Sequence, residues 1–232
     1  GIENGIEDEP NKAWIVREDD KMEAPTAYKD YPNPDTSDVT LYLTSGAPQT
    51  GNLSTIKQEK QEKQGKETLV DNYSFSGEAL AQAEITNHRL LYVTPKLSKD
   101  IHISGLAQIT VKLASNEPAA NLSVWLVSLP WNSSRRAKTT DNIITRGWAD
   151  PQNYKSLTES KPLKTGKFYD VTFDLQPDDQ IIKAGQQIGL LIFSSDKEYT
   201  LHPKPGTELT IDLDGTHLNL PVVGGAEIFN KA

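Results

Sequence analysis

The residues with the greatest chemical reactivity are scattered along this 232-residue chain. Its four histidines, His88, His102, His202 and His217, form no H-x-x-x-H pair, and no G-x-S-x-G motif occurs. Those spacings would place metal ligands on one helix face or a nucleophilic serine on a sharp turn. The lack of cysteine excludes a thiolate zinc site, a disulfide scaffold and a cysteine nucleophile. The pattern predicts no catalytic residue, metal ligand or cofactor site, and we expect His102 and His217 to face outward from strands.

Two groups of acidic residues have spacings that invite a chemical interpretation. Asp178 and Asp179 are adjacent, but paired carboxylates do acid–base work only where burial separates their pKa values. We expect this pair to lie in a solvated turn after a proline. Asp212, Asp214 and Gly215 partly match a calcium loop, yet the glycine comes too early and the glutamate at position twelve is missing. A hairpin turn is the better interpretation of that segment.

Aromatic residues beside turn signals are the remaining candidates for a functional site. Trp131 lies in LPWNSSRR, and Trp148 lies in RGWADPQNYKSL together with Arg146 and Tyr154. Both stretches have the composition of loops at strand ends, where large rings need a cover. Two interpretations stay open: the rings fill the core from a loop, or they seat this domain against a neighbour. On the second, Trp131, Arg146, Trp148 and Tyr154 form an interdomain interface.

Composition excludes several classes of partner. The formal charge of −8 argues against nucleic acid, because phosphate binding needs clustered Lys and Arg. No apolar stretch approaches the roughly 20 residues that cross a bilayer. The run KQEKQEKQGK from Lys57 to Lys66 has alternating charge and no apolar residue, so it cannot bury a face. We expect a solvated loop insert at about residues 55–68.

Alternation with a period of two predicts most of the secondary structure. Apolar residues alternate with polar ones or run continuously in segments separated by turn signals, which favours an all-β fold. IGLLIF (188–193) predicts a strand covered on both faces. We expect a jelly-roll-like, galactose-binding-domain-like β-sandwich of two antiparallel sheets with at most one or two short helices, EALAQAEI (78–85) being the helix candidate. The expected strands are residues 39–45, 89–94, 101–115, 121–129, 142–148, 168–175 and 186–195.

The segment ELTIDLDGTHLNLPVV predicts a β-hairpin near the C-terminus. Asp214 and Gly215 match a two-residue type I′ turn, in which glycine accepts the positive φ. That turn sets Ile211 opposite Leu218, so that both apolar stripes fall on one face.

Long stretches of this sequence resemble one enzyme family. RLLYVTPKLSKDIHISGLAQITVKLASNEPAANLSVWLVSL is similar to the C-terminal β-domain of the cocaine-esterase-like (CocE/NonD) α/β hydrolases. RGWADPQNYKSL, FYDVTFDLQPDDQIIKAGQQIGLLIFSSD and LHPKPGTELTIDLDGTHLNLPVVGG resemble bacterial Xaa-Pro dipeptidyl-peptidases more narrowly. The opening GIENGIEDEP resembles the segment that leaves the hydrolase part of such enzymes. We therefore expect residues 1–10 to be the remnant of that connection and residues 11–232 to be the β-sandwich domain.

The resemblance implies a function for the longer protein. The parent would be a serine hydrolase that releases N-terminal Xaa-Pro dipeptides from peptide substrates through an activated serine and an oxyanion hole. Its Ser, Asp and His would all lie in the upstream α/β-hydrolase domain, so this fragment would lack the triad. The resemblance also implies no cofactor, a homodimer and a cytoplasmic location. The domain's own contribution would be to pack against, shape or stabilise the hydrolase domain.

A second class of function stays open from the sequence. Jelly rolls often bind glycans, and fold alone does not decide function. A free-standing carbohydrate-binding module would use Trp131 and Trp148 as its stacking platform. An upstream G-x-S-x-G motif in the same reading frame would distinguish the two classes.

Overall fold

The computed structural model describes residues 5, 8–17, 24–57, 65–132 and 138–232. Within these residues the chain is mostly β, with two short α-helices, which confirms the predicted all-β sandwich. The expected strand segments form β3 (Thr36–Thr44), β6 (Arg89–Val93), β7 (Ile101–Gly105), β8 (Gln108–Ser115), β9 (Leu122–Leu129), β10 (Ile143–Ala149), β11 (Tyr169–Asp174), β13 (Gln187–Phe193), β14 (Glu208–Asp212) and β15 (His217–Val223).

Other elements were not predicted from the pattern. They are β1 (Ala13–Ile15), β2 (Thr26–Tyr28), β4 (Gly51–Ser54), β5 (Lys66–Val70), β12 (Asp178–Ile182), α2 (Gly225–Phe229) and the 3₁₀ turns η2 (Thr139–Asn142), η3 (Pro151–Asn153) and η4 (Leu213–Gly215). All of them are three to five residues long, too short for a period to be recognised. The predicted helix forms as α1 (Gly77–Gln82).

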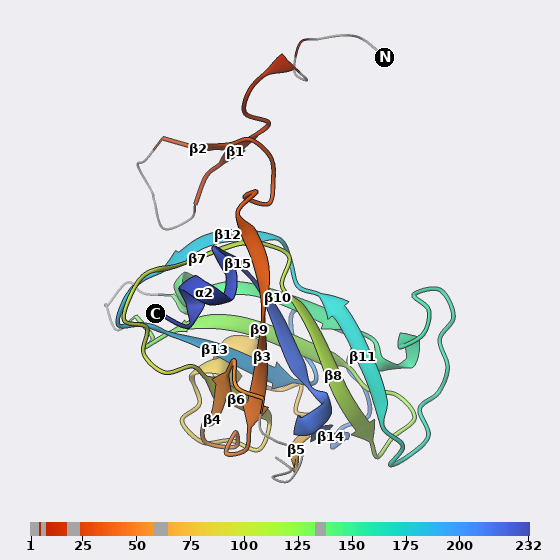
Figure 1. Cartoon of the computed structure of the whole chain (residues 1–232). Coiled ribbons are helices and arrows are strands. Elements are labelled where there is room, and N and C mark those ends of the chain that lie inside the picture. Colours follow the sequence, from red (N-terminus) through yellow and green to blue (C-terminus); the bar gives the residue numbers. More distant parts are fainter. Residues whose placement is uncertain (1–4, 6–7, 18–23, 58–64, 133–137) are drawn as a thin grey trace.

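Strand pairing is continuous through the described part of the sandwich. The order is β10-β9-β13-β6-β4-β3-β15-β8-β14-β5, with β11 beside β8, and β7 between β12 and β15. All pairs are antiparallel except β4–β6, which links the group around β13 to the group around β15. Figure 1 shows β3, β15, β8 and β11 crossing in front of β9 and β13. These crossing layers enclose the core.

Two hydrophobic clusters explain why the central strands are apolar at nearly every position. The larger cluster lies between the layers and includes Leu190 and Ile192 of β13. The smaller one covers the opposite face of β6, β9 and β13, and includes Leu191, Phe193 and Trp125. Residues 188–193 are all buried, so the predicted strand with two covered faces is confirmed.

Helix α1 lies over the smaller cluster because of its first turn. The side chain of Ser76 caps the helix by accepting a hydrogen bond from the Ala79 amide at 3.2 Å. Gly77 lies directly against Trp125, since a β-carbon at this position would approach the indole ring to 2.3 Å. The absence of a side chain at position 77 lets the helix pack flat on the tryptophan.

The predicted C-terminal hairpin is wrong. Strands β14 and β15 do not pair with each other, and instead follow one another along the same edge of β8. Ile211 lies opposite Leu113 and His217 lies opposite Thr110, so the chain keeps its direction through the turn. The apolar stripes are buried as the alternation predicted, but their strand partners are different ones.

Local hydrogen bonds explain why the chain does not reverse at this turn. Asp212 accepts a hydrogen bond from the Gly215 amide at 3.2 Å, and the Thr216 hydroxyl donates to the Asp212 carbonyl at 2.8 Å. These contacts close the single 3₁₀ turn η4. The Thr216 hydroxyl also accepts from the Lys112 amide of β8 at 3.1 Å, which anchors the turn to the strand that it follows.

Two further expectations concern boundaries and loops. The centre of the predicted insert, residues 58–64, lies outside the described residues, as do 1–4 and 6–7 of the expected connection. The division at residue 10 stays a prediction. In the described part of the chain, no helix is long and apolar enough to cross a membrane.

Candidate functional site

A metal centre is not formed by the residues that the structure describes. Among them, no three His, Cys, Asp or Glu side chains are grouped closely enough to hold an ion. Each histidine has a local neighbour: His88 contacts the Val70 carbonyl at 2.8 Å, His202 stacks on Tyr73, and His217 lies 6.5 Å from the ring of Tyr42. His102 belongs to an ionic cluster described below.

A buried carboxylate organises the most prominent aromatic surface. Asp196 follows β13 and is fully buried. Its Oδ2 atom accepts hydrogen bonds from the indole nitrogens of Trp125 at 3.2 Å and Trp148 at 3.1 Å. The Thr200 hydroxyl bonds to the backbone of Asp196, and the Tyr199 amide donates to its carbonyl at 2.9 Å. One side chain therefore holds strands β9 and β10 and the loop after β13.

Burial sets the protonation behaviour of Asp196. Removal from water raises the pKa of its carboxyl above the ordinary value, and nearby Glu198 acts in the same direction. The two indole donors and the charge of Arg146 oppose this rise without cancelling it.

Arginine and aromatic rings are layered above this carboxylate. Trp148 stacks on Tyr199 with ring centroids 5.0 Å apart and planes at 24°. The Arg146 guanidinium lies 4.3 Å from the centroid of the Tyr199 ring, and its Nη2 atom donates to the Tyr199 hydroxyl at 3.0 Å. Arg146 and Trp148 are two residues apart on β10, so their side chains leave the strand on the same side.

Exposed apolar residues extend this surface along one loop. Tyr199 is 54% exposed and Leu201 is 88% exposed, while the neighbouring His202 stacks on Tyr73 at 4.7 Å. We call Tyr73, Arg146, Trp148, Tyr199 and Leu201 the aromatic face. Exposed apolar side chains gathered on one surface are typical of an interaction site.

Only half of the predicted interface lies in the aromatic face. Arg146 and Trp148 come together there, within β10 and not in a loop. Trp131 is half-buried and packs against the smaller hydrophobic cluster. Tyr154 packs edge-on against Tyr169 at 4.6 Å, beside the larger cluster. For these two residues the core-filling interpretation fits the observed packing.

Tyr199 and Leu201 were not among the functional residues predicted from the sequence. Both lie in DKEYTLH, a polar loop that follows an entirely apolar strand. Trp131 was chosen because it is a large ring in a polar loop, and the same criterion would have identified Tyr199. Neither residue is distinguished by spacing or by a motif.

An ionic cluster lies between the β1–β2 pair and the sandwich. The Arg17 Nε atom donates to Asp179 Oδ1 at 2.8 Å, and the His102 Nε2 atom lies 3.0 Å from the same oxygen. The Tyr28 hydroxyl lies 3.2 Å from His102 Nε2 and also contacts Arg17. Asp179 is buried in β12, so the prediction of a solvated turn at Asp178 and Asp179 is wrong.

The charges of this cluster explain why Asp179 ionises easily. Burial alone would raise its pKa, but hydrogen bonds from His102 and Ser104, together with the charges of His102 and Arg17, outweigh that effect. The pKa of Asp179 therefore lies below its ordinary value.

A cleft of about 270 Å³ runs between β10 and the start of β12 and is lined by Arg146, Gln176 and Gln180 among others.

Together, the described residues define a β-sandwich with exposed aromatic and apolar side chains on its surface, and fold alone says no more about function. The chain belongs to the family described as the X-Pro dipeptidyl-peptidase C-terminal non-catalytic domain, whose model matches residues 4–227. This agrees with the resemblance found in the sequence.

Curated relatives are much longer than this chain. A putative Xaa-Pro dipeptidyl-peptidase of Rhodopirellula baltica is 61% identical over 225 residues, which cover 97% of this chain and 35% of the relative. One from Bacillus anthracis is 37% identical over 235 residues, covering 96% and 35%. The chain thus spans 35% of the length of these two relatives.

Solved structures share the fold at low sequence identity. An α-amino acid ester hydrolase superposes with a TM-score of 0.66 at 14% identity, over 85% of this chain and 39% of its own. A CocE/NonD family hydrolase from Staphylococcus aureus gives a TM-score of 0.60 at 12% identity, over 87% and 39%. These likenesses show that part of each of these two hydrolases has the same fold as this chain.

Proposed function

We propose that this chain is the C-terminal domain of a serine-type Xaa-Pro dipeptidyl-peptidase and that it packs against the catalytic part of the longer polypeptide. The aromatic face is the observation that carries this proposal. Tyr199 and Leu201 are largely exposed, and the Tyr199 ring stacks on Trp148, which is hydrogen-bonded to the fully buried Asp196. A rigid base beneath exposed apolar side chains is the arrangement expected of a preorganised interface.

The composition of the aromatic face suits contact between domains of one chain. Such interfaces bury roughly 600–1,500 Å² and are fairly polar. Arg146 supplies a guanidinium that already lies over the rings of Trp125, Trp148 and Tyr199. It can also pair with a carboxylate on the opposing surface. The aromatic face thus combines an apolar anchor with a directional charge.

The name of the Rhodopirellula baltica relative, putative Xaa-Pro dipeptidyl-peptidase, supports a proposal for the activity of the longer protein. We propose that the catalytic part releases N-terminal Xaa-Pro dipeptides through a serine nucleophile, as a homodimer in the cytoplasm. The carbohydrate-binding alternative is less favoured, because Trp148 and Tyr199 stack on each other and under Arg146. Trp131, the other ring proposed for that platform, packs against a core cluster.

Truncating the exposed side chains tests the docking proposal. We expect the double substitution Tyr199→Ala and Leu201→Ala to shorten the half-life of thermal inactivation of the longer polypeptide several-fold, because docking contacts are lost. The same substitutions should change the melting temperature of the isolated domain little, since both residues are mostly exposed.

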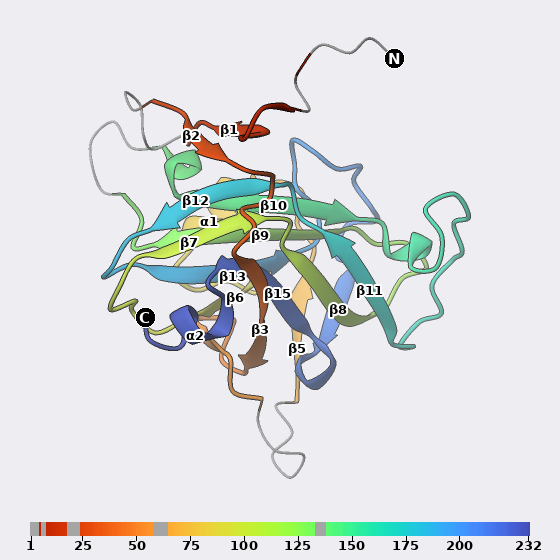
Figure 2. The ribbon, with the colours of Figure 1, turned by 45° about the horizontal axis from the view of Figure 1, so that its top comes forward.

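Ile56→Ala is the matched control. Ile56 is 74% exposed, and Figure 2 shows the segment after β4 and the loop after β13 at opposite ends of the body. An inactivation half-life for the double variant equal to that of the Ile56→Ala control would contradict docking through the aromatic face.

A further inference from the structure

The β1–β2 pair, which we call the N-terminal ribbon, forms a two-stranded sheet of its own, separate from the sheet of the sandwich. Figures 1 and 2 both show it beyond the end of the body, joined through the chain that leads into β3. Its two strands have three residues each, with Trp14 opposite Ala27 and Ala13 opposite Tyr28. A two-stranded sheet this short is not stable in water by itself. Its position must therefore depend on contacts with the rest of the polypeptide.

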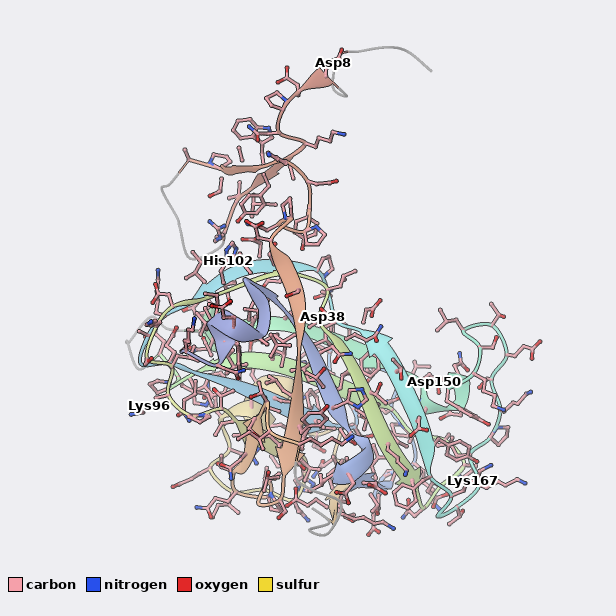
Figure 3. All side chains as sticks on the ribbon, in the orientation of Figure 1. Asp8, Asp38, Lys96, His102, Asp150 and Lys167 are labelled. Carbon is pink, nitrogen blue, oxygen red and sulfur yellow. The ribbon has the colours of Figure 1, made fainter. Side chains whose placement is uncertain are left out.

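The inner face of the ribbon is fixed to the sandwich. Arg17 and Tyr28 point toward β7 and β12, where they meet His102 and Asp179. The side chains of Arg17 and Asp179 are only 8% and 3% exposed, so the ion pair is shielded from solvent. Figure 3 shows His102 at the edge of the body that faces the ribbon. This ionic cluster holds the ribbon in one orientation.

The outer face of the ribbon carries large apolar side chains that the described residues leave exposed. Trp14 is 65% exposed and Val16 is 72% exposed. The alternation of side chains along an extended strand places both on the same side of the ribbon. The ionic cluster occupies the other side. Tryptophan is among the residue types that most often anchor an interface.

The length of the relatives identifies the occupant of this surface. The family is described as a C-terminal domain, and this chain spans 35% of its relatives, so their remaining length precedes the matched region. The ribbon is the first described element of the chain, so in a longer polypeptide with the organisation of these relatives it would be the element nearest to the preceding part.

We propose that Trp14 and Val16 form a second docking surface, separate from the aromatic face, for the catalytic part of the longer polypeptide. The Arg17–Asp179 ion pair positions this surface. The inference rests on the proposed function, because it takes the catalytic part as the partner. Two separated contacts on one domain fix its orientation more strongly than one contact does.

Hydroxyl-radical footprinting, read out by mass spectrometry, tests the proposal on the wild-type protein. The oxidation rates of Trp14, Tyr199 and Ile56 are compared between this chain alone and the longer polypeptide. We expect the oxidation of Trp14 to fall at least about fivefold in the longer polypeptide, because a residue at an interface core loses its exposure. The rate at Ile56 should not change.

The two proposals fail in distinguishable ways. Protection of Tyr199 with full oxidation of Trp14 would overturn the second docking surface and leave docking through the aromatic face intact. Full oxidation of both residues would overturn the proposed function together with this inference. Protection of Trp14 with an unchanged Ile56 supports the ribbon as a docking surface.

An Arg17→Gln variant of the longer polypeptide tests the positioning role of the ion pair. Glutamine removes the charge that pairs with Asp179, and we expect Trp14 to lose most of its protection while Tyr199 stays protected. Lys183→Gln is the matched control, because it removes the charge of an exposed ion pair, with Asp100, that belongs to neither docking surface. Unchanged protection of Trp14 in Arg17→Gln would show that the ion pair does not position the ribbon.

Discussion

Asp196 shows how one residue supports a surface that it does not reach. Its carboxylate is inaccessible to solvent, but it accepts hydrogen bonds from the indoles of Trp125 and Trp148. Trp148 in turn supports the exposed ring of Tyr199. Trp148 is therefore a structural residue as well as part of the aromatic face. For this reason Tyr199 and Leu201, and not Trp148, are the residues to truncate when docking is tested.

Substitution of Asp196 separates its hydrogen bonds from its charge. We expect Asp196→Ala to lower the free energy of unfolding by about 2 kcal/mol, because two buried indole donors lose their acceptor. Asp196→Asn keeps a carbonyl acceptor and should cost less at neutral pH. Urea unfolding of the isolated domain measures both, and equal losses would contradict the role of the acceptor.

The raised pKa of Asp196 gives a pH dependence with a definite sign. Folding favours its protonated form, so this contribution to stability is fully present below the pKa of the unfolded chain, about 4. The contribution is lost as pH rises through the higher pKa of the folded state. The wild type should therefore gain stability relative to Asp196→Asn as pH falls from 7 toward 4. A constant difference across that range would contradict the raised pKa.

At the scale of elements, the glycine at the start of α1 is a packing requirement. A β-carbon at Gly77 would lie 2.3 Å from the ring of Trp125, which is buried and hydrogen-bonded to Asp196. Because this ring cannot move aside, we expect Gly77→Ala to destabilise the domain by about 1–3 kcal/mol, despite alanine's higher helix propensity. Thermal unfolding of Gly77→Ala and of Glu78→Ala, a change at the adjacent exposed position, measures the effect. Equal melting temperatures would contradict the close packing.

The strands that the sequence predicts are the ones with long alternating or apolar runs. β13 and β9 could be found because their burial on two faces leaves no polar position in the middle. The pairing of β14 and β15 with β8 could not be predicted. The local sequence indicated a hairpin turn, but the contact of Thr216 with β8 keeps the chain running in the same direction. Strand β12 was missed because Asp179 is charged, and only the fold brings Arg17 to it from 162 residues away.

Part of the aromatic face could be predicted from the alternation of side chains along a strand. Arg146 and Trp148 share one side of a strand, so their proximity follows from period two. Tyr199 comes from another strand's loop, and its place beside Trp148 depends on Asp196. Trp131 and Tyr154 were predicted because they are large rings beside turn residues. In the structure, their packing against the two hydrophobic clusters explains why these positions are aromatic.

At the scale of the whole molecule, the described residues form an accessory domain. The family to which the chain belongs is described as non-catalytic, and its relatives are nearly three times longer. Within the sandwich, the titratable clusters around Asp196 and Asp179 each join segments distant in sequence. Both clusters serve packing, and each supports a surface with exposed aromatic residues.

The most direct test of the central claim is a comparison of this chain with the longer polypeptide in one assay. Both are incubated with a fluorophosphonate serine probe and with a chromogenic Xaa-Pro amide. We expect this chain to show neither labelling nor hydrolysis, because its sequence has no nucleophile elbow. The longer polypeptide should be labelled once per chain and should hydrolyse the amide. Stoichiometric labelling of a serine in this chain, with release of the chromophore, would contradict its assignment as a non-catalytic domain.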